Sequence, residues 1–412
     1  MEEMIKFSLK DYSCIGFDLD NTLARYKLSN LIELEYYIMA DFLIKQRHYP
    51  GDILLKPLDP NFLLKGLVID DKFGNVVKIA ADGAIVSAAH GTKWLNEEEL
   101  LNYYPTRHRQ FIDDYVDDPI EASNRCYNDK MRFSLDYFDI ANSLVYARAV
   151  DTVEQHRLHE KITEIWQDII DCLLYMFVSD HFHQDIGGYY PEIRRHPEKY
   201  YQKCSQSVLN WLLFLKSSGI RLFLISGAYA GSAHITAAYT IGENWQDYFD
   251  IIIFGARKPG FFTSHRDFLR VEGYKETHKI SENQLQLGGI YSIGNWSVVK
   301  IFLTNLCKSS DPKFLYIGDN LLQDVYTPNV CDKIDTLCIC EELEAENAFG
   351  FPGSHPDKNV LKSTLWGSFF FSDSSTLSYW GYLMKNYSRI FVPSIEYLAK
   401  FPVDYEFVSN NS

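Results

Sequence analysis

The sequence predicts an α/β fold, in which a parallel, doubly wound sheet is interrupted by a large inserted cap domain of mixed α+β structure. Short apolar runs that are typical of buried strands lie far apart in the chain. Helix-length stretches such as 208–217 lie between them, and this alternation is typical of parallel sheets. The apolar runs are 14–17, 222–225, 251–254, 314–317 and 336–339.

The long stretch between the first run and the second differs in character from the rest. It is rich in Tyr, and its Asp82-Gly83 dipeptide suits the tight turn of a hairpin. Helical patterns follow over 139–153 and 162–178. We therefore expect this stretch to fold as a separate cap.

The last part of the chain is rich in aromatic residues, which disordered tails lack. We therefore expect it to pack on the body of the protein. The predicted domains are a catalytic core formed by 1–27 with 206–345, a cap over 28–205, and a C-terminal segment over 346–412 that packs on the core.

Composition and charge exclude several classes of function. The 412 residues contain 40 Lys and Arg against 55 Asp and Glu, a net charge of −15. Such an acidic surface repels phosphate backbones, so we expect no nucleic-acid partner. We expect no membrane partner either, because no run approaches the ~20 apolar residues of a membrane helix. The eight cysteines lack a repeated C-x-x-C pattern and no secretory leader is visible, which favours reduced thiols in a cytoplasmic protein.

Polar side chains follow four of the apolar runs. Asp18 and Asp20 come after the first run, Ser226 after the second, Lys258 shortly after the third, and Asp319 after the fourth. In open α/β sheets, ligands bind outside the carboxyl ends of the strands. We therefore expect these groups to converge on one crevice.

The two carboxylates after the first run suggest covalent phosphate chemistry. A carboxylate can attack phosphorus and form an aspartyl-phosphate, which assigns Asp18 as the nucleophile. A second carboxyl can protonate the leaving oxygen and later activate water, which assigns Asp20 as the general acid and base. The alternative is a loop in which the Asp-x-Asp pattern caps a helix or faces solvent.

The other three segments can hold a phosphate and a cation. Ser226 and Gly227 can donate to phosphate oxygens, although a Ser-Gly pair is also common in simple turns. Lys258 can neutralise the phosphate and the attacking carboxylate, unless it is an ordinary surface lysine. Asp319 is a candidate Mg²⁺ ligand, and Asp324 can orient a metal-bound water or Lys258, while either could instead cap a helix.

Four motifs in this order resemble those of the haloacid dehalogenase (HAD) superfamily of phosphohydrolases. Further segments resemble the cytosolic purine 5′-nucleotidases, and this likeness extends over most of the chain. The four motifs are 18–22, Ser226, Lys258 and 318–324, and the further segments are 89–91, 256–262, 316–319 and 392–397.

The resemblance implies a Rossmann-like core with an inserted cap, and Mg²⁺-dependent hydrolysis of nucleoside monophosphates. It implies that the metal binds the Asp18 carboxylate, the backbone carbonyl of Asp20 and Asp319. In the cap, Phe138 and Asp139 fall where the family has a Phe-Asn pair that holds the base. The stacking ring is kept here, but the amide is replaced by a carboxylate.

Two further departures concern the phosphate and the base. A Ser-Gly-Ala run at 226–228 replaces a Thr-Asn-Ser-like run, so one hydroxyl and one amide that contact phosphate are missing. The stretch 166–171 lacks the Arg expected for reading a purine. The resemblance therefore predicts the phosphate chemistry better than the base.

We accordingly predict a Mg²⁺-dependent phosphomonoesterase of the 5′-nucleotidase type that acts on nucleoside 5′-monophosphates through an aspartyl-phosphate. One alternative is a phosphatase for another small phosphorylated metabolite or for a phosphoprotein. Another is a weakly active metal-binding protein that acts through partners. Family members are often oligomeric, so homo-oligomerisation is an open alternative to a monomer.

Overall fold

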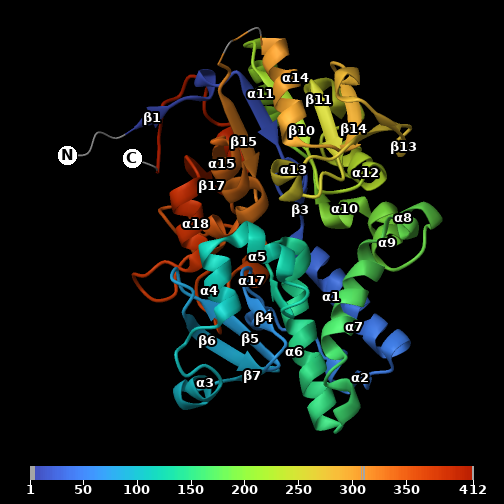
Figure 1. Cartoon of the computed structure of the whole chain (residues 1–412), viewed down its shortest axis with the longest axis vertical. Helices are drawn as coiled ribbons and strands as arrows, with labels where there is room; N and C mark the ends of the chain where they lie inside the picture. The colour runs from blue at the N-terminus through green and yellow to red at the C-terminus, as the bar shows by residue number, and fades with distance from the viewer. Residues whose placement is uncertain (1–4, 308, 310, 411–412) are drawn as a thin grey trace. The chain divides into compact units, whose positions relative to one another are not determined.

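The computed structural model of the chain describes residues 5–307, 309 and 311–410 (Figure 1). Its described part divides into two compact units. The first unit combines the chain up to Tyr26 with Tyr201–Glu341 and the chain from Leu383 onward. The second unit combines Lys27–Tyr200 with Glu342–Tyr382. Among the described residues, no helix has the length and apolar character that crossing a membrane requires.

Within the described residues, the first unit contains a nine-stranded sheet in the order β13-β12-β14-β11-β10-β2-β15-β16-β17. Neighbouring strands from β14 to β17 pair in parallel, whereas β12 pairs antiparallel with both β13 and β14 at one edge. Each of the five predicted runs is a strand of this sheet, so the predicted fold class is confirmed. The strands are β2 (Cys14–Phe17), β10 (Arg221–Ile225), β11 (Ile251–Phe254), β12 (Phe268–Glu272), β13 (Lys275–Ile280), β14 (Gly289–Ile293), β15 (Phe314–Gly318), β16 (Asp335–Ile339) and β17 (Ile390–Val392).

Both faces of this sheet are buried, each against different helices. Ile15 of β2 belongs to one apolar cluster with Leu212, while Cys14 belongs to a second cluster with Leu303. Successive residues of a strand point to opposite faces, so a strand buried on both sides is a continuous apolar run. The helices of this unit include α11 (Gln206–Ser217), α12 (Ala230–Thr240), α13 (Gly260–Thr263), α14 (Trp296–Cys307), α15 (Thr327–Asp332) and α19 (Ile395–Leu398).

The second unit contains, in its described residues, a five-stranded antiparallel sheet in the order β7-β6-β5-β4-β8. The predicted hairpin joins β5 to β6, and Gly83 in its turn has φ +85°, a conformation that favours glycine. The strands are β4 (Val68–Asp70), β5 (Asn75–Ile79), β6 (Ile85–His90), β7 (Lys93–Trp94) and β8 (Met131–Phe133).

Helices accompany this second sheet, and the two predicted from the sequence are confirmed as α6 and α7. Helix α1 contacts both of them. The helices are α1 (Leu28–Arg47), α2 (Gly51–Leu54), α3 (Glu97–Tyr103), α4 (Gln110–Asp117), α5 (Pro119–Arg125), α6 (Ile140–Gln155), α7 (Ile165–Phe177), α8 (Ser179–Gln184), α9 (Tyr189–Arg195), α10 (Pro197–Tyr200), α16 (Glu342–Glu346) and α17 (Lys358–Leu361).

The C-terminal segment differs from the prediction, because it does not pack as a whole on the core. Its part up to Tyr382 belongs to the second unit, whereas β17 extends the sheet of the first. The indole N–H of Trp366 donates to the carbonyl of Phe62 at 2.9 Å, and that of Trp380 to Gly66 at 2.7 Å. Buried indoles need such acceptors, and the second unit supplies them. The roles of the units as catalytic core and cap remain predictions.

Two short strands lie at the ends of the insertion. β3 (Arg25–Tyr26) pairs antiparallel with β9 (Tyr201–Gln202), with Tyr26 opposite Tyr201. The chain leaves the first unit directly after β3 and returns to it at β9. Both ends of the insertion are therefore held in one hydrogen-bonded ribbon.

Candidate active site

The strand register brings the predicted residues to one edge of the sheet. Phe17 of β2 lies opposite Leu224 of β10 and Ile317 of β15, so the chain leaves all three strands at the same level. The N–H of Asp18 donates to the carbonyl of Ile317 at 2.9 Å, which continues the ladder by one residue. The loops after these parallel strands therefore lie at one edge of the sheet, which is where the sequence predicts a common crevice.

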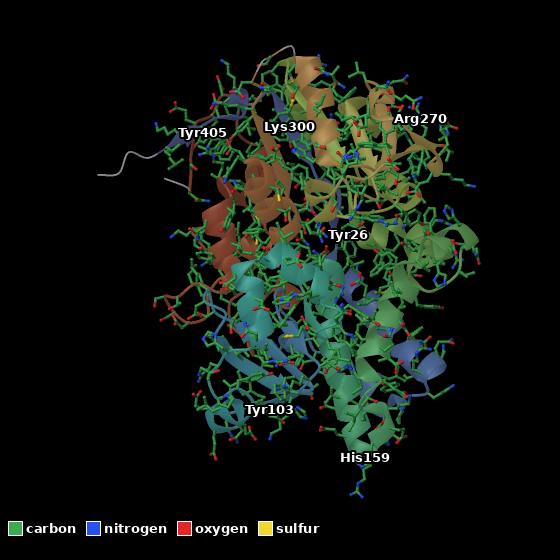
Figure 2. The ribbon with its side chains drawn as sticks, viewed as in Figure 1. Tyr26, Tyr103, His159, Arg270, Lys300 and Tyr405 are labelled. Atoms are coloured by element: carbon green, nitrogen blue, oxygen red, sulfur yellow. The ribbon has the colours of Figure 1, made fainter. Side chains whose placement is uncertain are left out.

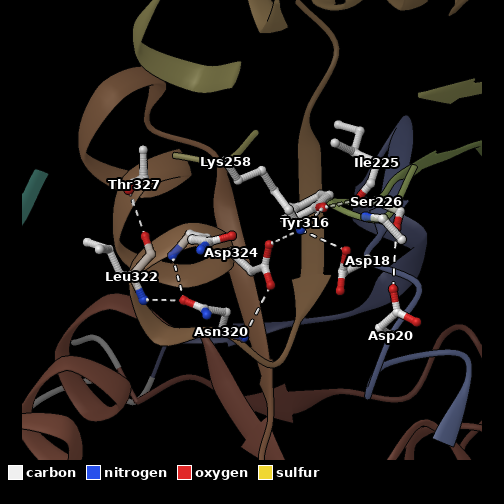
Figure 3. Close-up of polar contacts among 12 residues, drawn as sticks. Asp18, Asp20, Ile225, Ser226, Lys258, Tyr316, Asn320, Leu322, Asp324 and Thr327 are labelled. Atoms are coloured by element: carbon white, nitrogen blue, oxygen red, sulfur yellow. Dashed lines mark hydrogen bonds and ion pairs between the residues drawn. The ribbon is translucent and has the colours of Figure 1, made fainter. Parts of the chain in front are cut away.

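Lys258 is bound between two carboxylates at this edge of the sheet. Its Nζ donates to Oδ1 of Asp18 at 2.7 Å and to Oδ1 of Asp324 at 2.5 Å (Figure 3). The hydroxyl of Tyr316 lies 3.4 Å from Nζ and donates to the carbonyl of Ile225 at 2.9 Å. Burial opposes the charge, but the two carboxylates raise the pKa of Lys258 well above its usual range. Lys258 is therefore a buried ammonium and no surface lysine.

A third carboxylate completes the cluster. Among the described residues, Asp18, Asp319 and Asp324 each offer a carboxylate oxygen, and these oxygens lie within 4.8 Å of one another. All three side chains are buried, with 6%, 4% and 0% of their residues' surface exposed. Burial raises the pKa of Asp18, and the charges of Asp324 and Asp20 add to this against the opposing effect of Lys258. Hard oxygen donors gathered in this way suit a cation such as Mg²⁺.

The turn after β15 holds Asp324 in place. Gly318 packs closely on it, because a Cβ there would lie 2.4 Å from the Cβ of Asp324. The N–H of Asn320 donates to Oδ2 of Asp324 at 3.1 Å (Figure 3). The side-chain oxygen of Asn320 accepts from the N–H groups of Leu322 and Gln323. These residues open the π-helix Leu321–Tyr326. Asp324 is thus fixed toward Lys258, as its predicted orienting role requires.

Asp20 faces a different set of partners from Asp18. Its Oδ1 accepts from the hydroxyl of Tyr26 at 2.7 Å, and its Oδ2 from the hydroxyl of Ser226 at 3.5 Å. Burial raises the pKa of Asp20, although these hydrogen bonds and Lys258 act in the opposite direction. Asn21 has φ +54° in the turn that follows. The two carboxylates are therefore held in separate surroundings, which suits separate roles.

Ser226 and Gly227 lie between β10 and α12. Ser226 is fully buried, and its Oγ also accepts from the N–H of Ala228 at 3.1 Å. Gly227 is exposed, and a Cβ added there would meet no atom within 4 Å. Together with α12, which begins at Ala230, this loop offers N–H and hydroxyl groups to an anion.

The structure thus brings together the predicted residues of the first unit: Asp18, Asp20, Ser226, Gly227, Lys258, Asp319 and Asp324. It also adds Tyr26, Tyr316 and Asn320, which the sequence did not single out. A tyrosine in an apolar run is indistinguishable from a packing residue in the sequence. An Asn directly after Asp319 was the one available signal, since Asn is a common helix cap.

Phe138 and Asp139 lie in the second unit, in a 3₁₀ turn just before α6. The ring of Phe138 packs edge-on against Phe177, with 6.0 Å between centroids. Oδ1 of Asp139 accepts from Nη2 of Arg132 at 2.6 Å and from Nδ2 of Asn142 at 3.1 Å. The carboxylate that replaces the expected amide is therefore already ion-paired, and substrate contact by these two residues stays a prediction.

Comparison with known proteins decides the family. The model of the 5′ nucleotidase family matches residues 5–351. The chain belongs to the 5′ nucleotidase family. It is 31% identical to 5′-nucleotidase domain-containing protein 1 of Homo sapiens and 32% identical to that of Bos taurus, in each case over 98% of this chain and 94% of the relative. It is 27% identical to 5′-nucleotidase domain-containing protein 2 of Rattus norvegicus, over 83% of this chain and 59% of the relative.

As a member of the 5′ nucleotidase family, the chain is a phosphatase, as the sequence predicts. Among solved structures, a HAD phosphatase from Thermococcus onnurineus aligns at 14% identity with a TM-score of 0.28, over 60% of this chain and 83% of that chain. The fold class follows from the strand order of this chain itself.

Proposed function

We propose that this 5′ nucleotidase family member is a Mg²⁺-dependent phosphomonoesterase that hydrolyses nucleoside 5′-monophosphates through an aspartyl-phosphate on Asp18. One observation carries the proposal: the Lys258 ammonium is bound between Asp18 and Asp324, with Asp319 in the same cluster. This arrangement gives a nucleophile, a charge that attracts phosphate, and oxygen donors for a cation.

The charges of the cluster favour a divalent cation. Asp18, Asp319 and Asp324 with Lys258 carry a formal net charge of −3 + 1 = −2 when ionised. The Asp18 carboxylate, Asp319 and the backbone carbonyl of Asp20 would hold Mg²⁺, which would neutralise charge on the transferred phosphoryl group. A nucleophilic carboxylate must be ionised, and a nearby cation offsets the effect of burial on Asp18.

The chain's own residues divide the remaining tasks. An oxygen of Asp18 forms a bond to phosphorus while the bond from phosphorus to the sugar oxygen breaks. Asp20 gives its proton to that leaving oxygen, and then takes a proton from the water that hydrolyses the aspartyl-phosphate. Lys258, Ser226 and the N–H groups around Gly227 hold the phosphoryl oxygens throughout.

The proposal that the substrate is a nucleoside monophosphate is supported by the family and by the predicted role of Phe138 and Asp139 as contacts to the base. One observation favours a second candidate, a phosphatase for another small phosphorylated metabolite. The Asp139 carboxylate is ion-paired with Arg132, so it offers a base less hydrogen-bonding capacity than the amide that it replaces. A cytoplasmic location and homo-oligomerisation stay predictions.

Phosphate release from a panel of substrates tests the proposal. The panel contains nucleoside 5′-monophosphates, sugar phosphates and phosphopeptides, each with Mg²⁺ and with chelator. We expect turnover of a nucleoside monophosphate that needs Mg²⁺ and is lost in Asp18→Asn. Asp267→Asn is the matched control, because Asp267 is an exposed carboxylate paired with Lys279. Turnover by Asp18→Asn at the wild-type rate would remove Asp18 as nucleophile, and Mg²⁺ binding without turnover of any substrate would favour a binding protein.

A further inference from the structure

Tyr26 makes the shortest polar contact of the Asp20 carboxyl. The phenol hydroxyl donates to Oδ1 of Asp20 at 2.7 Å, while Ser226 reaches Oδ2 at the longer distance of 3.5 Å. Tyr26 is buried, with 2% of its surface exposed. It lies in β3, which is labelled in Figure 1, and the residue itself is labelled in Figure 2. Its ring packs on Tyr201, with 4.8 Å between centroids.

The strand that carries Tyr26 is anchored on both sides. Arg25 donates from Nε and Nη2 to the two oxygens of Glu341, each at 3.2 Å, and its Nη1 lies 3.6 Å from Oε2 of Glu396. Glu396 belongs to the tail segment 392–397, which resembles the cytosolic purine 5′-nucleotidases and has no role in the proposed mechanism. A bidentate Arg–carboxylate pair fixes direction as well as distance, so the backbone next to Tyr26 has little freedom.

The partner strand fixes Tyr26 from the other side. Nε2 of Gln202 donates to the carbonyl of Tyr26 at 3.1 Å. The hydroxyl of Tyr201 is hydrogen-bonded to that of Thr236 on α12 at 2.9 Å. The phenol of Tyr26 is thus built into a rigid frame that points its hydroxyl at Asp20.

The hydroxyl also distinguishes the two oxygens of Asp20. A phenol has one hydrogen to donate, and Tyr26 gives it to Oδ1 at 2.7 Å, whereas Oδ2 lies at the longer distance of 3.5 Å from the hydroxyl of Ser226. Oδ1 is therefore the oxygen that is held, and Oδ2 is the oxygen on the side of Ser226, where the phosphate is expected to bind. A general acid has to lie within about 2.6–3.2 Å of the atom that it protonates, so its orientation matters.

We propose that Tyr26 is a positioning residue that holds Asp20 with Oδ2 directed at the leaving oxygen, and that Arg25 anchors it through Glu341 and Glu396. The proposal rests on the proposed role of Asp20 as general acid. In the step concerned, the proton on Oδ2 moves to the leaving oxygen as its bond to phosphorus breaks and the bond from Asp18 to phosphorus forms. A tyrosine that serves packing alone would have no influence on this proton transfer.

The dependence of kcat/KM on the leaving group distinguishes a tyrosine that positions Asp20 from one that serves packing alone. A sugar alkoxide leaves only when it is protonated, whereas the phenolate of p-nitrophenyl phosphate leaves without a proton. The measured quantity is kcat/KM, because it reports the steps up to loss of the leaving group. In Tyr26→Phe we expect kcat/KM for an alkyl phosphate to fall by about tenfold, and that for p-nitrophenyl phosphate by less than about threefold. Asp20→Asn should show the same selectivity with a larger loss, about 10²–10⁴ for the alkyl phosphate.

Tyr12→Phe is the matched control, since it removes a buried phenol hydroxyl that donates to a carboxylate of the same unit, Oδ2 of Asp335 at 2.8 Å, at the opposite ends of the strands from Asp20. We expect it to change kcat/KM for both substrates equally. Arg25→Lys is the second variant, because Lys cannot make both parallel bonds to Glu341. Arg25→Lys should lose more kcat/KM for the alkyl phosphate than for p-nitrophenyl phosphate, as Tyr26→Phe does. If Tyr26→Phe does not fold, the result for Arg25→Lys tests the positioning role in its place.

Equal losses for both substrates in Tyr26→Phe, or no loss, would overturn the positioning role. Suppose that Tyr26→Phe gives either of these results, while Asp18→Asn is inactive and Asp20→Asn loses more kcat/KM for the alkyl phosphate than for p-nitrophenyl phosphate. The proposed function then stands, and only the positioning role of Tyr26 is wrong. If Asp18→Asn keeps wild-type turnover, or if Asp20→Asn shows no selectivity, both proposals fall together.

Discussion

Replacing Lys258 with Met tests whether the buried ammonium holds the cluster together in the absence of a cation. Lys258 bridges Asp18 and Asp324 at 2.7 and 2.5 Å, and all three side chains are buried. Removing one partner of a buried ion pair leaves an uncompensated charge, which costs about 3–5 kcal/mol of unfolding free energy. We therefore expect Lys258→Met to be destabilised by about this amount in chelator.

The assay is urea unfolding with chelator, and Lys300→Met is the matched control. Lys300 (Figure 2) pairs with Asp332 at 2.8 Å but is 39% exposed, so its removal should cost less than about 1 kcal/mol. Mg²⁺ should stabilise Lys258→Met more than the wild type, because the cation then supplies charge that the lysine no longer provides. If Lys258→Met and Lys300→Met unfold at the same urea concentration in chelator, the bridging role of the ammonium is wrong.

The remaining predictions concern the metal, the turn after β15 and the pH. Asp319→Asn should raise the Mg²⁺ concentration for half-maximal turnover by at least about tenfold, measured by titration of phosphate release. Gly318→Ala should lower kcat/KM by about tenfold or more, because its Cβ would displace Asp324, 2.4 Å away. Burial raises the pKa of Glu346 from 4.5 to about 7, so its stabilising contribution is complete below pH 4.5 and is lost as pH rises through about 7. Glu346→Gln should remove up to about 3 kcal/mol of this pH dependence, measured by urea unfolding.

Each of these has an outcome that contradicts it. An unchanged Mg²⁺ titration in Asp319→Asn would exclude that carboxylate as a ligand. Gly318→Ala with wild-type kcat/KM would mean that the position of Asp324 has no bearing on turnover. For Glu346, parallel stability curves of the variant and the wild type between about pH 5 and pH 8 would show that this carboxyl does not take up a proton on folding.

The position of the site was predictable because of the way in which its strands are buried. A strand covered on both faces is a continuous apolar run, and β2, β10, β11 and β15 all have this form. Parallel pairing then places Asp18, Ser226 and Asp319 at one edge. By contrast, β14 contains Gly, Tyr and Ser, and β17 has three residues, so neither stands out by its composition.

The residues that orient the site were not predictable in this way. Tyr316 lies within an apolar run, and the carbonyl that accepts its hydrogen is 91 residues away in the sequence. In the sequence, Tyr26 is likewise indistinguishable from a packing residue, and the structure shows that its hydroxyl donates to Oδ1 of Asp20. The division of the C-terminal segment was missed for a related reason: an aromatic composition indicates burial, but it does not indicate which surface does the burying.

The path of the chain between the two units limits how this protein could have been assembled in evolution or could be re-engineered. The chain crosses between the units after residues 26, 200, 341 and 382, so the second unit is made from two separate pieces. Excising 27–200 alone would strip Trp366, Phe369 and Trp380 of the surface that buries them and expose an aromatic patch prone to aggregation. A graft of this unit onto another phosphatase therefore has to carry both pieces at once.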